Sequence, residues 1–202
     1  MNLTANEIDA LAEVVNIGVG KAASVLNEVI NSHICLQIPY ITILSPTQAV
    51  EALSQRLGDE YLSAVRLGFT GTLSGNAQLI FPTDSASKLV AAIMNEDLGN
   101  DDLDSLKIGA ITEVGNIFIS GVMGAISNLL KQDFNYSLPA YLEGIVPQLL
   151  NEKGYDSQAT ILLAQARFTV EQLQIEGDIV LIFKVGSFEA LLLAIKQVYG
   201  EA

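Results

Sequence analysis

The chain has few of the residues that usually reveal an enzyme: among its 202 residues are one cysteine, one histidine and no tryptophan. Cys35 has no second cysteine with which to form an internal disulfide. It stands in an apolar run, Ile34-Cys35-Leu36, where we expect a small buried side chain rather than a reactive thiol. A histidine-based zinc site or a Ser-His-Asp triad would depend on His33 alone. Its place before an apolar run predicts a structural role instead.

Basic residues are also scarce, with 10 Lys and Arg against 23 Asp and Glu and a formal net charge of −13. Such a surface repels a phosphate backbone, so no nucleic-acid partner is expected. The charge suits either simple solubility or docking to a protein with a basic rim. The first residues lack the basic and apolar segments of a signal peptide, and no apolar run is long enough to span a membrane. We therefore expect a cytoplasmic protein without membrane insertion.

One short pattern is present twice. Glu13 and Asn16 recur as Glu113 and Asn116, each pair is followed by Ile, and Pro39 and Pro139 follow at the same distance. A Glu and an Asn three positions apart on a helix lie on one face, one turn from each other. The chain thus presents a carboxylate beside a carboxamide twice. A single Glu-x-x-Asn would be weak evidence, but Asn is a poor mid-helix residue and here it recurs in two divergent copies.

The first copy lies on a predicted helix from Thr4 to about Asn31. Thr4 is the expected N-cap, and Glu7 completes a capping box. An apolar stripe predicts a buried face, and a second row outside it should be accessible. The stripe is Leu11, Val14, Gly18, Ala22, Val25 and Val29, and the accessible row is Asp9, Glu13, Asn16 and Gly20. In the second copy Asp104 is the expected N-cap, and Lys107 replaces Glu7.

The remaining segments repeat in the same order, so residues 1–97 and 103–202 each contain a helix, a strand, a hairpin and a closing helix. Each half has only about three strands, and a joint sheet would bury the helices better than two separate domains. We predict one α+β (α/β) domain of two pseudo-twofold-related halves. The expected strands are 33–44, 61–70, 72–81, 135–145, 159–170 and 178–185, and the shorter helices are 46–57, 85–95 and 187–199.

The glycines near the first motif do not form a phosphate loop. A Walker A motif needs Gly and Ser or Thr where Val15 and Ala22 stand. Gly20 lies one turn beyond Asn16, as Ser120 lies one turn beyond Asn116, so small residues leave room for another surface to approach. Gly18, in the apolar stripe, is interpreted as a close helix–helix contact.

The repeated pair includes no covalent nucleophile or histidine, and Asp9 with Glu13 makes a poor metal site. These sites therefore supply a carboxylate and an amide and need the remaining groups from a partner. Two other interpretations stay open: a module that binds a phosphorylated protein without hydrolysis, and a scaffold whose Glu-Asn rows are merely solvated.

The chain resembles the CheC family of chemotaxis phosphatases, whose motif is Asp or Ser, three residues, Glu, two residues, Asn, and a Pro after twenty-two more. The first half meets it in full and the second half departs from it at Gly109. The matching residues are Asp9, Glu13, Asn16 and Pro39 in the first half, and Glu113, Asn116 and Pro139 in the second.

This resemblance implies long motif-bearing helices packed on an antiparallel sheet, and hydrolysis of the aspartyl phosphate of the response regulator CheY. It implies that Asn16 and Asn116 orient the attacking water, as a glutamine does in small GTPases. Glu13 and Glu113 would pair with a receiver lysine, and Asp9 would contact the rim. The Mg²⁺ would belong to the receiver, so no cofactor of its own is expected. CheD is a possible partner, and two motifs in one chain are consistent with a monomer.

Overall fold

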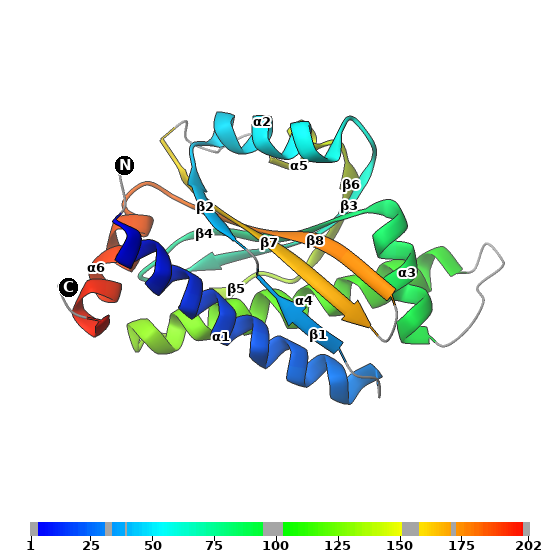
Figure 1. The fold of residues 1–202 in the computed structure, drawn as a ribbon, viewed down its shortest axis with the longest axis horizontal. Helices are drawn as coiled ribbons and strands as arrows, with labels where there is room; N and C mark the ends of the chain where they lie inside the picture. The colour runs from blue at the N-terminus through cyan, green and yellow to red at the C-terminus, as the bar shows by residue number, and fades with distance from the viewer. Residues whose placement is uncertain are drawn as a thin grey trace.

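The structure is a computed structural model that describes residues 4–30, 34–38, 40–94, 103–150, 158–170 and 173–199. His33, Pro39 and the connector at 95–102 lie outside the described residues. The helices cover both faces of one sheet (Figure 1). They are α1 (Ala5–Ile30), α2 (Pro46–Leu57), α3 (Thr83–Met94), α4 (Leu103–Leu130), α5 (Val146–Leu150) and α6 (Ser187–Tyr199).

The described strands form a single antiparallel sheet of eight strands. They are β1 (Ile34–Gln37), β2 (Ile41–Leu44), β3 (Leu62–Thr70), β4 (Gly75–Pro82), β5 (Asn135–Tyr136), β6 (Ala140–Gly144), β7 (Thr160–Val170) and β8 (Leu173–Phe183). The order is β1-β7-β8-β4-β3-β5, with β2 also paired to β7 and β6 to β3. The predicted α+β class, with an antiparallel sheet and pseudo-twofold halves, is therefore confirmed.

The two halves exchange their edge strands. The hairpins β3–β4 and β7–β8 meet at the centre, where Gly75 pairs with Phe183 and Ile80 with Asp178. The first half supplies β1 and β2 to the outer strand of the second hairpin, and the second half supplies β5 and β6 to the first. Each motif helix therefore leads into a strand that completes the hairpin of the other half.

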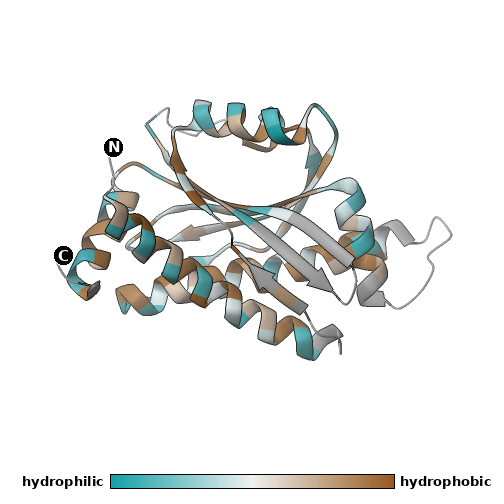
Figure 2. Ribbon diagram, in the orientation of Figure 1, coloured by the Kyte–Doolittle hydropathy of each residue, from teal (hydrophilic) through white to brown (hydrophobic). Residues whose placement is uncertain are grey.

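Two hydrophobic cores lie on the two faces of this sheet. The larger one packs α1, α4, α3 and α6 against the sheet and includes Phe69, Phe118, Phe183 and Phe188. The smaller one lies under α2 and α5 and includes Leu53 and Leu149. Hydrophilic and hydrophobic residues alternate along α1, as expected of a helix with one buried face (Figure 2).

The helices α1 and α4 cross at glycines. A Cβ added at Gly18 would lie 2.4 Å from the Val122 Cα, and one added at Gly121 would lie 2.6 Å from the Gly18 carbonyl oxygen. Only a hydrogen atom fits at this crossing, so the close contact predicted at Gly18 is confirmed. Among the described helices, α4 is long and apolar enough to cross a membrane over Ser105–Leu130. Part of its apolar surface lies in the core, where Phe118 and Val122 are fully buried, while Leu106 and Ile108 near its start are exposed.

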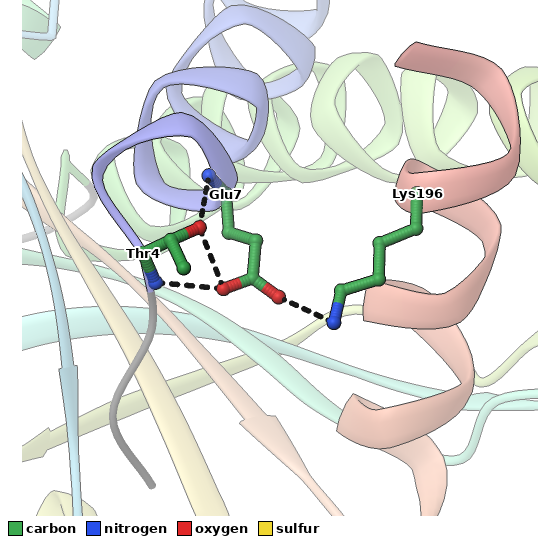
Figure 3. Close-up of polar contacts among 3 residues, drawn as sticks. All are labelled: Thr4, Glu7 and Lys196. Atoms are coloured by element: carbon green, nitrogen blue, oxygen red, sulfur yellow. Dashed lines mark hydrogen bonds and ion pairs between the residues drawn. The ribbon is translucent and has the colours of Figure 1, made fainter. Parts of the chain in front are cut away.

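The predicted capping box at the start of α1 is confirmed (Figure 3). The Thr4 backbone N–H and hydroxyl donate to the Glu7 carboxylate at 2.7 and 2.9 Å, and the Glu7 backbone N–H donates to the Thr4 hydroxyl at 3.3 Å. The other carboxylate oxygen lies 2.9 Å from the Lys196 ammonium on α6. The pKa of Glu7 is lowered to about 2, chiefly by the Thr4 backbone N–H, with Lys196 contributing.

Several predicted details were wrong. Cys35 is exposed rather than buried, because β1 is an edge strand and successive side chains of a strand point to opposite faces. Asp104 does not precede its helix, since α4 already begins at Leu103. The strand predicted at 33–44 is divided into β1 and β2, and the strand predicted from Asp178 begins at Leu173. The short helix α5 was not predicted.

Candidate functional site

The first motif lies along the solvent-facing side of α1. Asp9, Glu13, Asn16 and Gly20 are all exposed, while Leu11 and Val14 between them are buried. Steps of three and four residues place the four motif positions on one row, away from the sheet. The carboxylate and the carboxamide are thus available to another molecule.

The second motif lies on α4, where Glu113 and Ser120 are exposed and Asn116 is half-buried. The Ser120 hydroxyl donates a hydrogen bond of 3.4 Å to the Asn116 side-chain oxygen. Ser120 was interpreted as a small residue that leaves space, but it also holds the carboxamide. The spacing of four residues between Asn116 and Ser120 was a signal for this contact. Gly20, which has no side chain, offers Asn16 no such bond.

The two motifs form two sites rather than one. The helices run in opposite directions across each other, with the crossing at Gly18 and Gly121 (Figure 1). The row on α1 runs from this crossing toward α6, to which Glu7 is joined by its ion pair with Lys196. The row on α4 runs toward α3. The two motif rows therefore lie apart from each other on the two long helices.

Two motif glycines are not required by packing within the chain. A Cβ added at Gly20 or at Gly109 would meet nothing within 4 Å. Gly20 therefore leaves open space beside Asn16. Gly109 replaces the residue that corresponds to Asp9, so the start of the second site has one polar contact fewer.

Each site offers a carboxylate and a carboxamide as its polar groups. Within the part of the chain that the structure describes, no group of three or more His, Cys, Asp or Glu residues could hold a metal ion. Such a pair can accept a hydrogen bond from a cation and can orient a water molecule. Covalent chemistry at these positions would need the reacting group and its electrophilic partners to come from the bound molecule.

Comparison with known proteins agrees with this arrangement. No protein-family model matches the chain. The chain is 25% identical over 200 residues to the CheY-P phosphatase CheC of Bacillus subtilis (strain 168), and this alignment covers 94% of the chain and 93% of that protein. The resemblance to the CheC, CheX and FliY family is confirmed.

The solved structures show the same fold at low identity. The crystal structure of Thermotoga maritima FliY superposes with a TM-score of 0.76 at 17% identity, over 98% of this chain and 99% of that one. A chain from the FliG–FliM complex of H. pylori gives a TM-score of 0.69 at 9% identity, over 95% of this chain and 100% of that one. The same fold is thus found in FliY and in a chain crystallised in a complex.

Proposed function

We propose that this chain hydrolyses the aspartyl phosphate of a CheY-type response regulator in chemotaxis signalling. The observation that carries the proposal is the Glu-x-x-Asn pair on both crossing helices of a chain similar to a CheY-P phosphatase, exposed on α1 and with an exposed Glu113 and a half-buried Asn116 on α4. The proposal gives both rows one common role, as positions where a phosphorylated receiver docks.

Each row would complete a site that the receiver already holds in part. The receiver brings the phosphoryl group, its Mg²⁺ and a lysine, and it needs a well-placed water. Asn16 or Asn116 orients that water in line with the scissile bond, a role known from phosphoryl-transfer enzymes. Glu13 or Glu113 pairs with the receiver lysine and fixes the relative position of the two surfaces. The chain itself contributes no cofactor to this reaction.

The neighbouring residues support docking. Asp9 extends the first row toward the rim of the contact, and the open space at Gly20 lets the receiver backbone approach Asn16. At the second site the Ser120 hydroxyl holds the carboxamide of Asn116. We expect the chain to act in the cytoplasm as a monomer with two independent sites, and CheD is a possible further partner.

The test is phosphate release from a phosphorylated receiver in Mg²⁺ buffer. Replacing both Asn16 and Asn116 by Ala should reduce the acceleration by about a hundredfold, the usual effect of losing a positioning group. Asn128→Ala is the matched control, since Asn128 is an exposed residue of the same type on α4, outside the motif row. Wild-type rates from the double variant would refute the proposed mechanism.

The ion pair can be tested separately through docking. Glu13→Lys should weaken binding of a receiver that carries a phosphate mimic more than Glu13→Gln does, because a second cation would face the receiver lysine. Equal affinities for the two variants would argue against this pair.

A second candidate is a module that binds a phosphorylated receiver, or CheD, without hydrolysis. The similarity to a chain from the FliG–FliM complex favours keeping it, because that chain has the same fold and is found in a protein complex. If the wild-type chain binds the phosphorylated receiver and leaves its lifetime unchanged, this candidate replaces the first. A purely structural scaffold predicts neither binding nor acceleration.

A further inference from the structure

A cavity of about 290 Å³ lies between α3, the start of α4 and the strands β3 and β6. The strand residues Ser63, Tyr141 and Glu143 give it a polar wall, and the helices contribute Ala86 and Ile111 as apolar surface together with the polar side chains of Lys107 and Ser87. Residues 107, 108 and 111 of α4 face the cavity, whereas Glu113 and Asn116 lie on the opposite side of that helix. The cavity is therefore separate from the second motif.

The polar wall contains a chain of hydrogen bonds that ends on a carboxylate. The Tyr141 hydroxyl donates to Glu143 at 2.6 Å, and the Ser63 hydroxyl lies 3.1 Å from the Tyr141 oxygen. Because the Tyr141 proton is committed to Glu143, Ser63 donates to Tyr141. Ser63 is 2% exposed, so this chain runs from the interior of the sheet to the mouth of the cavity. The carboxylate at its end keeps accepting positions for a ligand.

At the corresponding described positions of the other half, the residues that line this cavity are replaced by others. The buried positions Ala86, Leu89 and Val90 of α3 recur with the same spacing on α6, where Phe188 stands in the place of Ala86. The Phe188 ring is fully buried and contacts Phe183, with ring centroids 5.6 Å apart.

The strand residues differ in the same sense. Tyr141 and Glu143 correspond, one hundred positions earlier, to Ile41 and Ile43, which pack against the hydrophobic core. Where one half has a large ring and two aliphatic side chains, the other has a methyl group and two polar side chains. The two halves therefore differ on both α3 and β6, and the differing side chains line the same cavity. This is expected of a binding site rather than of a packing defect.

We propose that this cavity binds a small zwitterionic molecule with a short apolar side chain, of the chemical class of the α-amino acids. Glu143 and the Tyr141 ring receive its ammonium group, and Lys107 on α4 receives its carboxylate. The apolar part lies against Ile111 and fills the space above Ala86. The volume lies at the lower end of the range for ligand sites and so suits a small molecule. The site does not depend on the proposed phosphatase activity.

In the test, the whole chain is titrated with three probes of similar size, and binding is measured by calorimetry and by NMR chemical shifts. Leucine carries both charges, isopentylamine only the ammonium, and isovalerate only the carboxylate. Leucine should bind with a dissociation constant in the millimolar range or below, and at least about tenfold more tightly than either single-charge probe. No saturable binding of leucine, or equal binding of all three, would overturn the proposal.

Variants locate the binding. Glu143→Gln, which keeps the shape of the side chain, should weaken leucine binding about tenfold or more. Ala86→Phe, which introduces the residue found at position 188, should abolish it, and circular dichroism checks its fold. Glu189→Gln, an exposed change on α6, is the matched control and should bind as wild type does. Unchanged affinity in Glu143→Gln would refute the assignment even if the Ala86 variant fails to fold.

Discussion

Two glycines on α1, separated by two positions, should respond to the same substitution in opposite directions. Gly18 is at the crossing with α4, where an added Cβ would lie 2.4 Å from the Val122 Cα and 2.7 Å from the Gly121 carbonyl oxygen. Gly20 faces solvent, and a Cβ there would meet nothing within 4 Å. The comparison therefore separates helix packing from helix propensity within one element.

The magnitudes follow from the geometry. Ordinary van der Waals contacts begin at 3.4 Å, so Gly18→Ala must separate two backbones by about 1 Å along the largest helix interface. Overpacking of this kind costs about 1–3 kcal/mol. Because the clashing atoms belong to the backbone and cannot move away by changing rotamer, we expect a cost at the upper end of this range. Replacing a mid-helix Gly by Ala returns about 1 kcal/mol at either position. We expect Gly18→Ala to destabilise the chain by about 2 kcal/mol and Gly20→Ala to stabilise it by about 1 kcal/mol.

Urea and thermal unfolding of the two variants measure this difference. For a chain of this size, about 3 kcal/mol between them corresponds to melting temperatures roughly 6–12 °C apart. A Gly18→Ala variant as stable as Gly20→Ala would show that the helices do not cross as closely as described. A destabilised Gly20→Ala would show that this position is not open space.

Three further results are expected. Because the pKa of Glu7 is lowered in the folded chain, its carboxylate stabilises the fold above the ordinary carboxyl pKa of about 4.3, and this stability is lost as the pH falls toward about 2. The free energy of unfolding of Glu7→Gln should therefore fall less between these two pH values than that of the wild type. Arg56→Ala removes the ion pair between Arg56 and the fully buried Asp178 carboxylate and should cost about 3 kcal/mol in urea unfolding, most of which a second change, Asp178→Asn, should restore. In a chain whose first site is disabled, Ser120→Ala should reduce phosphate release, but by less than Asn116→Ala does, because it only frees the carboxamide to rotate.

Local features of this fold were predictable from the sequence. The capping box depends on Thr4 and Glu7, three positions apart, and the place of Gly18 in the apolar stripe of its own helix predicted a close contact there, so spacing within one helix revealed both. The period of one hundred residues revealed the pseudo-symmetry. The predicted strand ended at residue 145, and Pro147, near the start of α5, was an available helix signal that was not used.

Features that depend on distant segments were not predictable in the same way. An apolar run around Cys35 gives the same pattern in an edge strand as in a central one, and only the pairing of β1 with β7 places this thiol in solvent. The cavity beside Ala86 arises because α3, β6 and the start of α4 meet there. No periodicity in one segment records such a meeting.

The exchange of edge strands has a consequence for any attempt to divide the chain. A fragment ending at Met94 would retain β3 with neither of its outer partners, β5 and β6, and would carry β1 and β2 with no strand to join. Unpaired strand edges bind other strands. Such a fragment should therefore be recovered as a dimer of itself, or as a heterodimer when a fragment starting at Leu103 is present. In the heterodimer, the motif helix of each fragment would lead into a strand that pairs with the hairpin of the other fragment. Mutating the motif of one fragment would therefore remove one site and leave the second motif on an intact sheet.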